Sequence, residues 1–288
     1  MTSRKPIAVA TNDSAQSQAA VLWAAHRAEK SGVPLAVLHV VDDRWVAEPY
    51  PWFGVLEEAG DQLLKTAAGR VRGVTPATVT TRLLTGSVGG SLAKYSGKAS
   101  MLVIGSGSGH LGGTLADRAL QVAASAKVPV AVVGTQDLTG RSGVVVGVDG
   151  SREATQAVAF AAAEADREGD ELTVVYAVRM PDPVTDAGLA PASLAGMVSE
   201  EERVVLSETV AGLEEDYPDL LVHRVLDTER DPVDALVHAA DGARMLVVGS
   251  RGRGGIKRLL LGSTAHGVLK HLPCPTVITR IQAGKNKA

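Results

Sequence analysis

The sequence contains very little cysteine, few aromatic residues and no long apolar segment. Cys274 is the single cysteine among 288 residues, so no disulfide can form within the chain, as is usual for proteins of the reducing cytoplasm. No uninterrupted apolar run reaches the roughly 18 residues of a membrane-spanning helix, and the first residues carry no apolar segment ahead of a cleavage site. We therefore expect a soluble, cytoplasmic protein without a membrane partner.

The chain also lacks an excess of charge of either sign. Its formal net charge is −3 at pH 7, which gives no reason to expect nucleic acid or an anionic membrane as a partner. Hydrophobic residues make up 45% of the chain and aromatic residues only 3%, so we expect cores packed mainly from aliphatic side chains. At roughly 100–200 residues per domain, the length predicts two domains.

The chain contains one unit twice. Residues 6–41 align with residues 143–178, so that Ser14 meets Ser151 and Gly32 meets Gly169. Further along, Met-Leu-Val-Ile-Gly-Ser at 101–106 meets Met-Leu-Val-Val-Gly-Ser at 245–250. The small drift between the two offsets is what loop insertions produce. Internal repeats of this length indicate two copies of one folding unit.

Each copy alternates β-branched apolar runs with Ala-rich or amphipathic stretches, which predicts βαβ units and a parallel sheet covered by helices on both faces. We expect an α/β fold of two tandem Rossmann-like domains, each with a five-stranded parallel sheet. The expected strands are 7–11, 35–41, 78–84, 101–104, 130–133, 144–148, 172–178, 221–226, 245–248 and 276–279. The expected helices include 14–30, 54–72, 88–97, 151–168, 192–215, 232–240 and 264–272. The domains are 1–139 and 140–283, followed by a disordered tail, 284–288.

The most specific motif lies in the second copy, where Gly249, Gly252, Gly262 and Ser263 form the pattern Gly-x2-Gly-x9-Gly-Ser. Glycines let backbone N–H groups approach phosphate oxygens. We expect Ser263 to cap the following helix, whose first turn would face the phosphates. Residues 249–263 carry four cations and no acidic residue. The motif therefore predicts a polyanion site, to which we also assign Ser250, Arg251, Arg253, Gly254, Gly255 and Thr264.

The first two strands of the second copy should also contribute, because ligands of open α/β sheets bind beyond the carboxyl ends of the strands. Asp149 ends the first strand and is suited to a ribose hydroxyl or to a nucleotide-bound Mg²⁺. Gly147 is expected to leave room for the base or ribose. Backbone groups of Ala177 and Val178 are candidates for the adenine edge.

These residues carry a family resemblance. The order of strands and helices, Val-Asp-Gly-Ser at 148–151 and the glycine motif look like the ATP-binding branch of the universal stress protein family, which has an adenine-nucleotide-hydrolase-like fold. The resemblance implies ATP with Mg²⁺ as ligand, held by Gly249, Gly252, Gly262, Ser263 and Asp149. It also implies pairing of the two domains through their last strands, a homodimer, an unknown protein partner, and a regulatory role in stress or dormancy.

The first copy departs from this pattern. Gly105 remains, but Ser108 replaces the second motif glycine and Asn12 replaces the aspartate. Alignment backward from Pro129 puts Ala-Asp at 116–117 in place of Gly-Ser, and alignment forward from Gly105 puts Arg-Ala at 118–119 there. Neither restores the motif. We expect the first domain to be structural or to bind something other than ATP.

Other interpretations remain open for the second copy. A slow ATP-hydrolysing or ATP-activating enzyme of the adenine nucleotide hydrolase-like superfamily is the main alternative, although no residue stands out as a catalytic base. A nucleotide-free interaction protein is a third possibility. The segment 251–255, Arg-Gly-Arg-Gly-Gly, resembles an RNA-binding repeat, but a single short copy between two core elements argues against that role.

Overall fold

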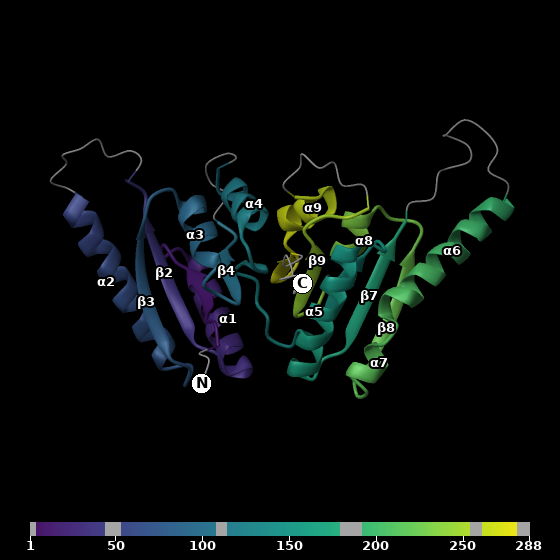
Figure 1. Cartoon of the computed structure of the whole chain (residues 1–288), viewed down its shortest axis with the longest axis horizontal. Helices are drawn as coiled ribbons and strands as arrows, with labels where there is room; N and C mark the ends of the chain where they lie inside the picture. Colours follow the sequence, from purple (N-terminus) through teal and green to yellow (C-terminus); the bar gives the residue numbers. More distant parts are fainter. Residues whose placement is uncertain (1–3, 44–52, 108–113, 179–191, 254–260, 281–288) are drawn as a thin grey trace, which may run out of the picture. The chain divides into compact units, whose positions relative to one another are not determined.

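The computed structural model describes residues 4–43, 53–107, 114–178, 192–253 and 261–280, with side chains omitted for 114–118 and 192–199. By its internal contacts the chain divides into two compact units, unit 1 over Met1–Asp137 and unit 2 over Leu138–Ala288 (Figure 1). Each unit is an α/β domain with a parallel sheet.

Unit 1 has a five-stranded sheet in the order β3-β2-β1-β4-β5. All of its strand pairs are parallel. Its strands are β1 Ile7–Ala10, β2 Leu35–Val41, β3 Val79–Thr85, β4 Met101–Gly105 and β5 Val130–Val133. Its helices are α1 Ala15–Ser31, α2 Phe53–Arg72, α3 Val88–Ser96 and α4 Thr114–Ser125.

Unit 2 repeats this arrangement, with its strands in the order β8-β7-β6-β9-β10 and every pair parallel. Its strands are β6 Val144–Val148, β7 Leu172–Ala177, β8 Val222–Asp227, β9 Met245–Gly249 and β10 Thr276–Thr279. Its helices are α5 Arg152–Glu168, α6 Ala192–Val210, α7 Leu213–Asp216, α8 Pro232–Ala239 and α9 Ser263–His271. The expected fold of two tandem Rossmann-like domains is confirmed.

The two sheets share not only strand order but register. In unit 1, Ile7 lies opposite Leu35 and Met101; in unit 2, Val144 lies opposite Leu172 and Met245. These partners are the residues that the sequence repeat aligns. A slip of one residue would turn every side chain of a strand to the other face, so equal register means that each position of one unit has a structural counterpart in the other.

The helix ends follow from local sequence. Ser14 caps α1 by accepting a hydrogen bond from the Ser17 N–H, and Ser151 caps α5 through the Ala154 N–H. Both helices end at a glycine in the left-handed region. The stretch predicted as one helix over 192–215 is interrupted, because Gly212 takes a φ of 85° and starts the short helix α7.

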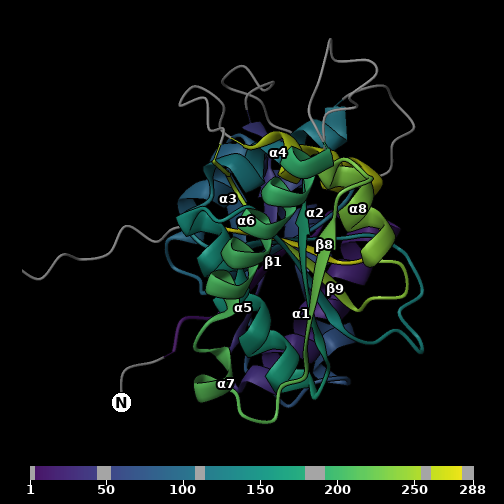
Figure 2. The same ribbon diagram turned by 90° about the vertical axis from the view of Figure 1, so that its right-hand side faces the viewer.

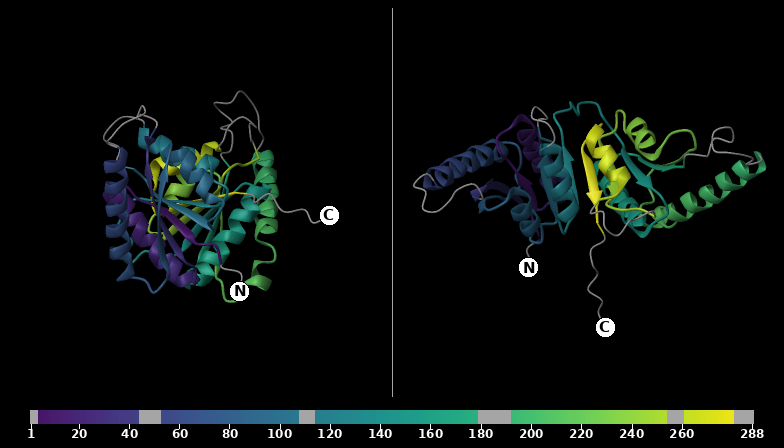
Figure 3. Two further views of the ribbon diagram at one scale, coloured as in Figure 1. Left: turned by 60° about the vertical axis from the view of Figure 1, so that its left-hand side comes forward. Right: turned by 90° about the horizontal axis from the view of Figure 1, so that it is seen from above.

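Helices cover both faces of each sheet. In unit 1, α1 and α2 pack together on one face, and α3 and α4 pack together on the other. In unit 2, α5 and α6 run side by side on one face (Figure 2). The other face carries α8 and α9, which are neighbours in the right-hand view of Figure 3. This layering leaves the carboxyl ends of the central strands as the place where loops and helix starts converge.

Among the described residues, no helix is both long enough and apolar enough to span a bilayer. Strands β5 and β10 come last in the order of their own units. The pairing of the two domains through these strands, and the homodimer, stay predictions.

The single cysteine is part of the core of unit 2. Cys274 is fully buried, and burial raises the pKa of its thiol to about 12. Because the thiolate is the reactive form, we expect Cys274 of the native protein to be protected from a disulfide reagent at pH 8. One equivalent should react once the chain is unfolded in denaturant. Rapid stoichiometric labelling of the native protein would contradict the packing described here.

Candidate functional site

Unit 2 has a cavity of about 400 Å³ at the carboxyl ends of β6 and β9, within the size range of small-molecule sites. Most of the residues predicted for the phosphate site line it. The lining residues are Gly147, Val148, Asp149, Ala154, Val175, Ala177, Pro232, Leu236, Val248, Gly249, Arg251, Gly252, Arg253, Leu261, Gly262, Ser263, Thr264 and Ala265.

Asp149 holds the loop after β9 against the end of β6. Its Oδ1 accepts a hydrogen bond from the Ser151 N–H at 3.0 Å, and its Oδ2 accepts one from the Arg253 N–H at 2.7 Å. The sequence assigned Asp149 to a ribose or Mg²⁺. The structure adds a contact that the sequence did not reveal, because the two partners of the carboxylate lie about a hundred residues apart.

Gly252 is required by this contact. A Cβ atom at this position would lie 2.1 Å from Asp149 Oδ2, far inside van der Waals contact. Gly249 is the other motif glycine of this loop. A Cβ atom at Gly249 would lie 3.1 Å from the carbonyl oxygen of Arg251 and 3.2–3.3 Å from Glu153 in the first turn of α5. Both glycines therefore keep the loop close to the strand ends, which places its backbone at the cavity wall.

The two ends of the loop are joined through Ser250. Ser250 is buried. Its N–H donates to Thr279 O at 2.9 Å, and its carbonyl accepts from the Gly262 N–H at 2.8 Å. Ser250 was predicted as a site residue, but it is not among the residues that line the cavity. Its contribution is to fix Gly262 beside the strand end.

The cap of α9 differs from the prediction. Gly262, with φ −68° and ψ 156°, is the N-cap residue, and Ser263 is the first residue of the helix. The Gly262 carbonyl accepts from the His266 N–H at 2.9 Å, and no side chain caps the helix. The first N–H groups of a helix lack intrahelical acceptors. Ser263, Thr264 and Ala265 line the cavity, and no side chain caps the amides of this first turn, as an anion site requires.

Arg253 does not point freely into the cavity. Its Nη1 donates to Tyr176 Oη at 3.1 Å, and its guanidinium lies 6.0 Å from the centre of the Tyr176 ring. Burial and a hydrogen bond to Glu202 raise the pKa of the Tyr176 hydroxyl. Tyr176 therefore stays neutral, accepts from Arg253 and donates to Glu202. The loop is thereby linked through β7 to helix α6.

Gly150 makes room for this arrangement. Its φ is 75°, and a Cβ atom there would lie within 2.7 Å of Val205 Cγ1 on α6 as well as in contact with the Arg253 guanidinium. Arg253 and Val205 of α6 therefore both approach the turn after β6 at Gly150, which has no side chain to keep them apart. Sequence reasoning missed Tyr176, Glu202 and Val205, since none of them belongs to a local motif.

Two further arginines, Arg251 and Arg280, lie close enough to influence each other. The side chain of Arg251 is exposed and lines the cavity. Burial, together with the charge of Arg251, lowers the pKa of Arg280 at the end of β10. Two like charges close enough to affect each other are relieved by an anion between them or beside them.

The apolar end of the cavity differs from the prediction at one position. Gly147 lines the cavity beside Leu236 of α8, and a Cβ atom at Gly147 would lie 2.8 Å from Leu236 Cδ1. Ala177 lines the cavity as expected. The Val178 N–H donates to Asp227 O at 2.9 Å and is not available to a ligand. Gly254 and Gly255 lie outside the described residues.

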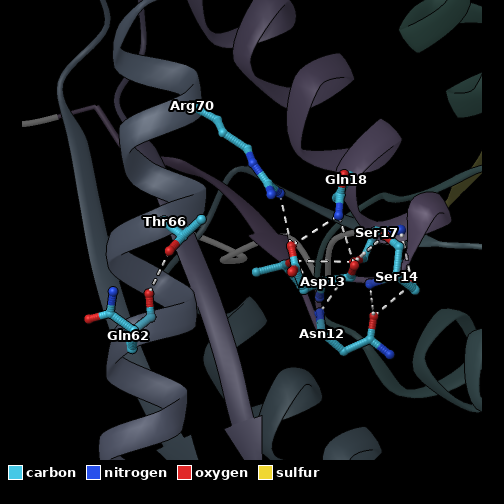
Figure 4. A network of polar contacts seen from close by, with 9 residues as sticks. Asn12, Asp13, Ser14, Ser17, Gln18, Gln62, Thr66 and Arg70 are labelled. Carbon is cyan, nitrogen blue, oxygen red and sulfur yellow. Dashed lines mark hydrogen bonds and ion pairs between the residues drawn. The ribbon is translucent and has the colours of Figure 1, made fainter.

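The corresponding turn of unit 1 is built differently (Figure 4). Asn12 stands in place of Asp149, and its Oδ1 accepts from the N–H and the hydroxyl of Ser14 at 3.2 and 2.8 Å. Asp13 stands in place of Gly150 with φ 62°, and its carboxylate accepts from Gln18 and Arg70. The described part of this turn therefore bonds to its own helices α1 and α2.

We expect Gly252→Ala to lower the free energy of unfolding of unit 2 by about 1–3 kcal/mol, because the new methyl group displaces Asp149. The control is the same substitution in an Asp149→Ala background, where the loss should fall below about 0.5 kcal/mol because the two sites are coupled. The urea concentration at which Cys274 becomes reactive reports on unit 2. Equal losses in both backgrounds would contradict the contact.

Known proteins resemble the chain over nearly its whole length. A model of the universal stress protein family matches residues 3–134 and again residues 141–280. A universal stress protein of Mycobacterium tuberculosis is 34% identical over 289 residues, covering 95% of this chain and 96% of its own. One of Mycolicibacterium smegmatis is 33% identical over 294 residues, with coverages of 95% and 96%.

Solved structures agree with the fold. The crystal structure of a universal stress protein from Archaeoglobus fulgidus matches 96% of this chain and 96% of its own with a TM-score of 0.70, at 21% identity. That of a putative universal stress protein from Pseudomonas aeruginosa matches 96% of this chain and 93% of its own with a TM-score of 0.60, at 17% identity. Because the family model matches both halves, the chain belongs to the universal stress protein family and carries two tandem copies of its domain.

Proposed function

We propose that unit 2 binds ATP and that the chain acts as a nucleotide-dependent binding module in a stress or dormancy response. The observation that carries the proposal is the meeting, at one cavity, of an uncapped helix start, a loop of close-packed glycines and arginine side chains. Each of these favours an anion with several oxygen atoms.

The phosphates would lie at the first turn of α9. The N–H groups of Ser263 and Thr264 would donate to them, and Arg251 would add charge-assisted hydrogen bonds. Arg253 would reach them by leaving Tyr176. Among the described residues that line the cavity, Asp149 is the only acidic one, and two backbone N–H groups donate to its carboxylate. The residues present therefore fit a polyphosphate.

The base and ribose would occupy the apolar end. The apolar side chains that line the cavity include those of Val175, Ala177, Pro232, Leu236 and Val248. A flat heterocycle suits such a surface, since apolar lining with few polar groups is typical of small-molecule sites.

Magnesium would be held mainly by the phosphates. Among the described residues, no three His, Cys, Asp or Glu side chains come together as a metal site. Asp149 keeps lone pairs beyond the two that accept N–H groups, so it can contact a nucleotide-bound Mg²⁺ directly or through water. Mg²⁺ usually retains several waters and binds through few carboxylates, which matches a single aspartate.

A binding role is favoured over hydrolysis by the same lining. General-base catalysis needs a side chain free to take a proton within hydrogen-bond reach. Asp149 is the one acidic side chain among the described residues that line the cavity, and its lone pairs are shared between two backbone N–H groups and the nucleotide-bound Mg²⁺ proposed above. No histidine lines the cavity in the described part of the chain. We therefore propose retention of ATP, with negligible turnover, as the normal state.

Calorimetric titration with MgATP tests this function. We expect one ATP per chain for the native sequence. Gly262→Asp should weaken binding by roughly a hundredfold or more, because a carboxylate about 4 Å from a phosphate costs about 4 kcal/mol at an effective dielectric near 20 before salt screening.

The matched control is Gly262→Asn. A Cβ atom at Gly262 lies 3.4 Å from its nearest neighbour, and Asn and Asp are equally good helix caps. The two variants therefore match in size and capping ability and differ in charge and in the two amide N–H donors of Asn, so Asn should retain most of the affinity. Two sites per chain, or equal losses in the two variants, would contradict the proposed phosphate position. Steady release of phosphate under saturating MgATP would favour the enzyme instead.

A further inference from the structure

Unit 1 retains a cavity at the position that corresponds to the ATP site proposed for unit 2. Its volume is about 280 Å³, against about 400 Å³ in unit 2. It lies at the carboxyl ends of β1 and β4, beside α3 and α4. The lining residues are Ala10, Thr11, Asn12, Ser14, Ser17, His39, Val40, Val88, Leu92, Ile104, Gly105, Gly107, Ala119 and Val122.

Equal register allows the two cavities to be compared position by position. The apolar wall is retained: Leu92 corresponds to Leu236, and Ile104 corresponds to Val248. It is also narrower, because Ala10 replaces Gly147 and Val40 replaces Ala177. The part of a nucleotide that such a wall accommodates is the base and ribose. This step rests on the function proposed for unit 2.

The charged part of the site is not retained. Asp149, Arg251 and Arg253 line the cavity of unit 2, whereas none of the residues described around the cavity of unit 1 is Lys, Arg, Asp or Glu. His39 lines the cavity as well, and its Nδ1 is bonded to Thr11 O at 2.7 Å. A phosphate placed against the described lining would lose its hydration without gaining a lysine or arginine. The described part of the cavity therefore favours an uncharged ligand.

Asn12 supplies hydrogen-bond donors at the mouth of this cavity. The orientation of its amide follows from its contacts, because the Ser14 N–H can only be met by the amide oxygen. This leaves Nδ2 with two N–H groups, which none of the described residues accepts. Ser14 and Ser17 are engaged with each other and with Thr11. The two N–H groups of Asn12 Nδ2 are thus the donors that this site offers to a ligand.

We propose that the cavity of unit 1 binds an uncharged nucleoside, with its apolar face against Leu92 and Ile104 and an acceptor atom on the amide of Asn12. The two units of one chain then have different ligand chemistry, a triphosphate in unit 2 and a neutral nucleoside in unit 1.

The probe is adenosine, titrated into the full chain in the presence of saturating MgATP so that the second site is filled. We expect one adenosine to bind per chain. Asn12→Asp keeps the acceptor of the Ser14 hydrogen bonds and removes both donors, so adenosine affinity should fall about tenfold. Ala10→Leu fills the cavity and should abolish binding. ATP affinity should stay unchanged in both variants.

If Ala10→Leu does not fold, Asn12→Asp alone decides, since it alters an exposed position. Absence of adenosine binding, or binding that Asn12→Asp leaves unchanged, would overturn the proposal. The two functions fail separately. Adenosine binding that depends on Asn12, without any ATP binding, would remove the function of unit 2 and leave this site standing, whereas ATP binding without adenosine binding would do the reverse.

Discussion

The site in unit 2 depends on one carboxylate. Asp149 accepts two backbone N–H groups, one from the turn after β6 and one from the loop after β9. These two bonds bring the loop over the strand end, which is why Gly252 has no space for a side chain. At the base of the same loop, the carbonyl of Ser250 accepts from the Gly262 N–H and holds Gly262 at the start of α9. An anion site of backbone amides needs such a support, because amides bind strongly only when their direction is fixed in advance.

The first unit shows the same scaffold with a different support. Asn12 turns its oxygen inward to Ser14, and Asp13 occupies a left-handed conformation that a glycine holds in unit 2. The carboxylate of Asp13 is bound by Arg70 of α2 (Figure 4). Exposed ion pairs of this kind stabilise little, so its main effect is on geometry. The difference of two residues at one turn thus directs its polar contacts to the loop after β9 in unit 2 and to a neighbouring helix in unit 1.

Periodicity and local signals were enough to predict the fold. Strands β5 and β10 begin and end where their apolar runs predicted, and Ser14 and Ser151 start their helices as caps. The site was predictable where its residues form a local motif or end a strand, as Asp149 does, but not where packing between separate elements decides. Gly262 rather than Ser263 caps α9, because the Gly262 N–H donates to the carbonyl of Ser250, and this bond fixes the extended backbone that a cap needs. The packing of Leu236 against Gly147 is likewise a contact between separate elements, which local sequence patterns do not reveal.

Under the proposed function Arg253 has two sets of partners, Tyr176 and the phosphates. In the structure it donates to Tyr176, whose hydroxyl binds Glu202 of α6. A phosphate is a stronger acceptor for Arg253 than a phenol, since it carries the opposite charge and can accept two parallel N–H bonds from the planar guanidinium. Transfer of Arg253 to the phosphates would remove its guanidinium from the position between the Gly150 turn and Val205. Coupling between sites is reciprocal. If the proposed ATP site is correct, any partner that prefers α6 in one of these two arrangements would change the affinity for ATP by the same factor as ATP changes the affinity for that partner.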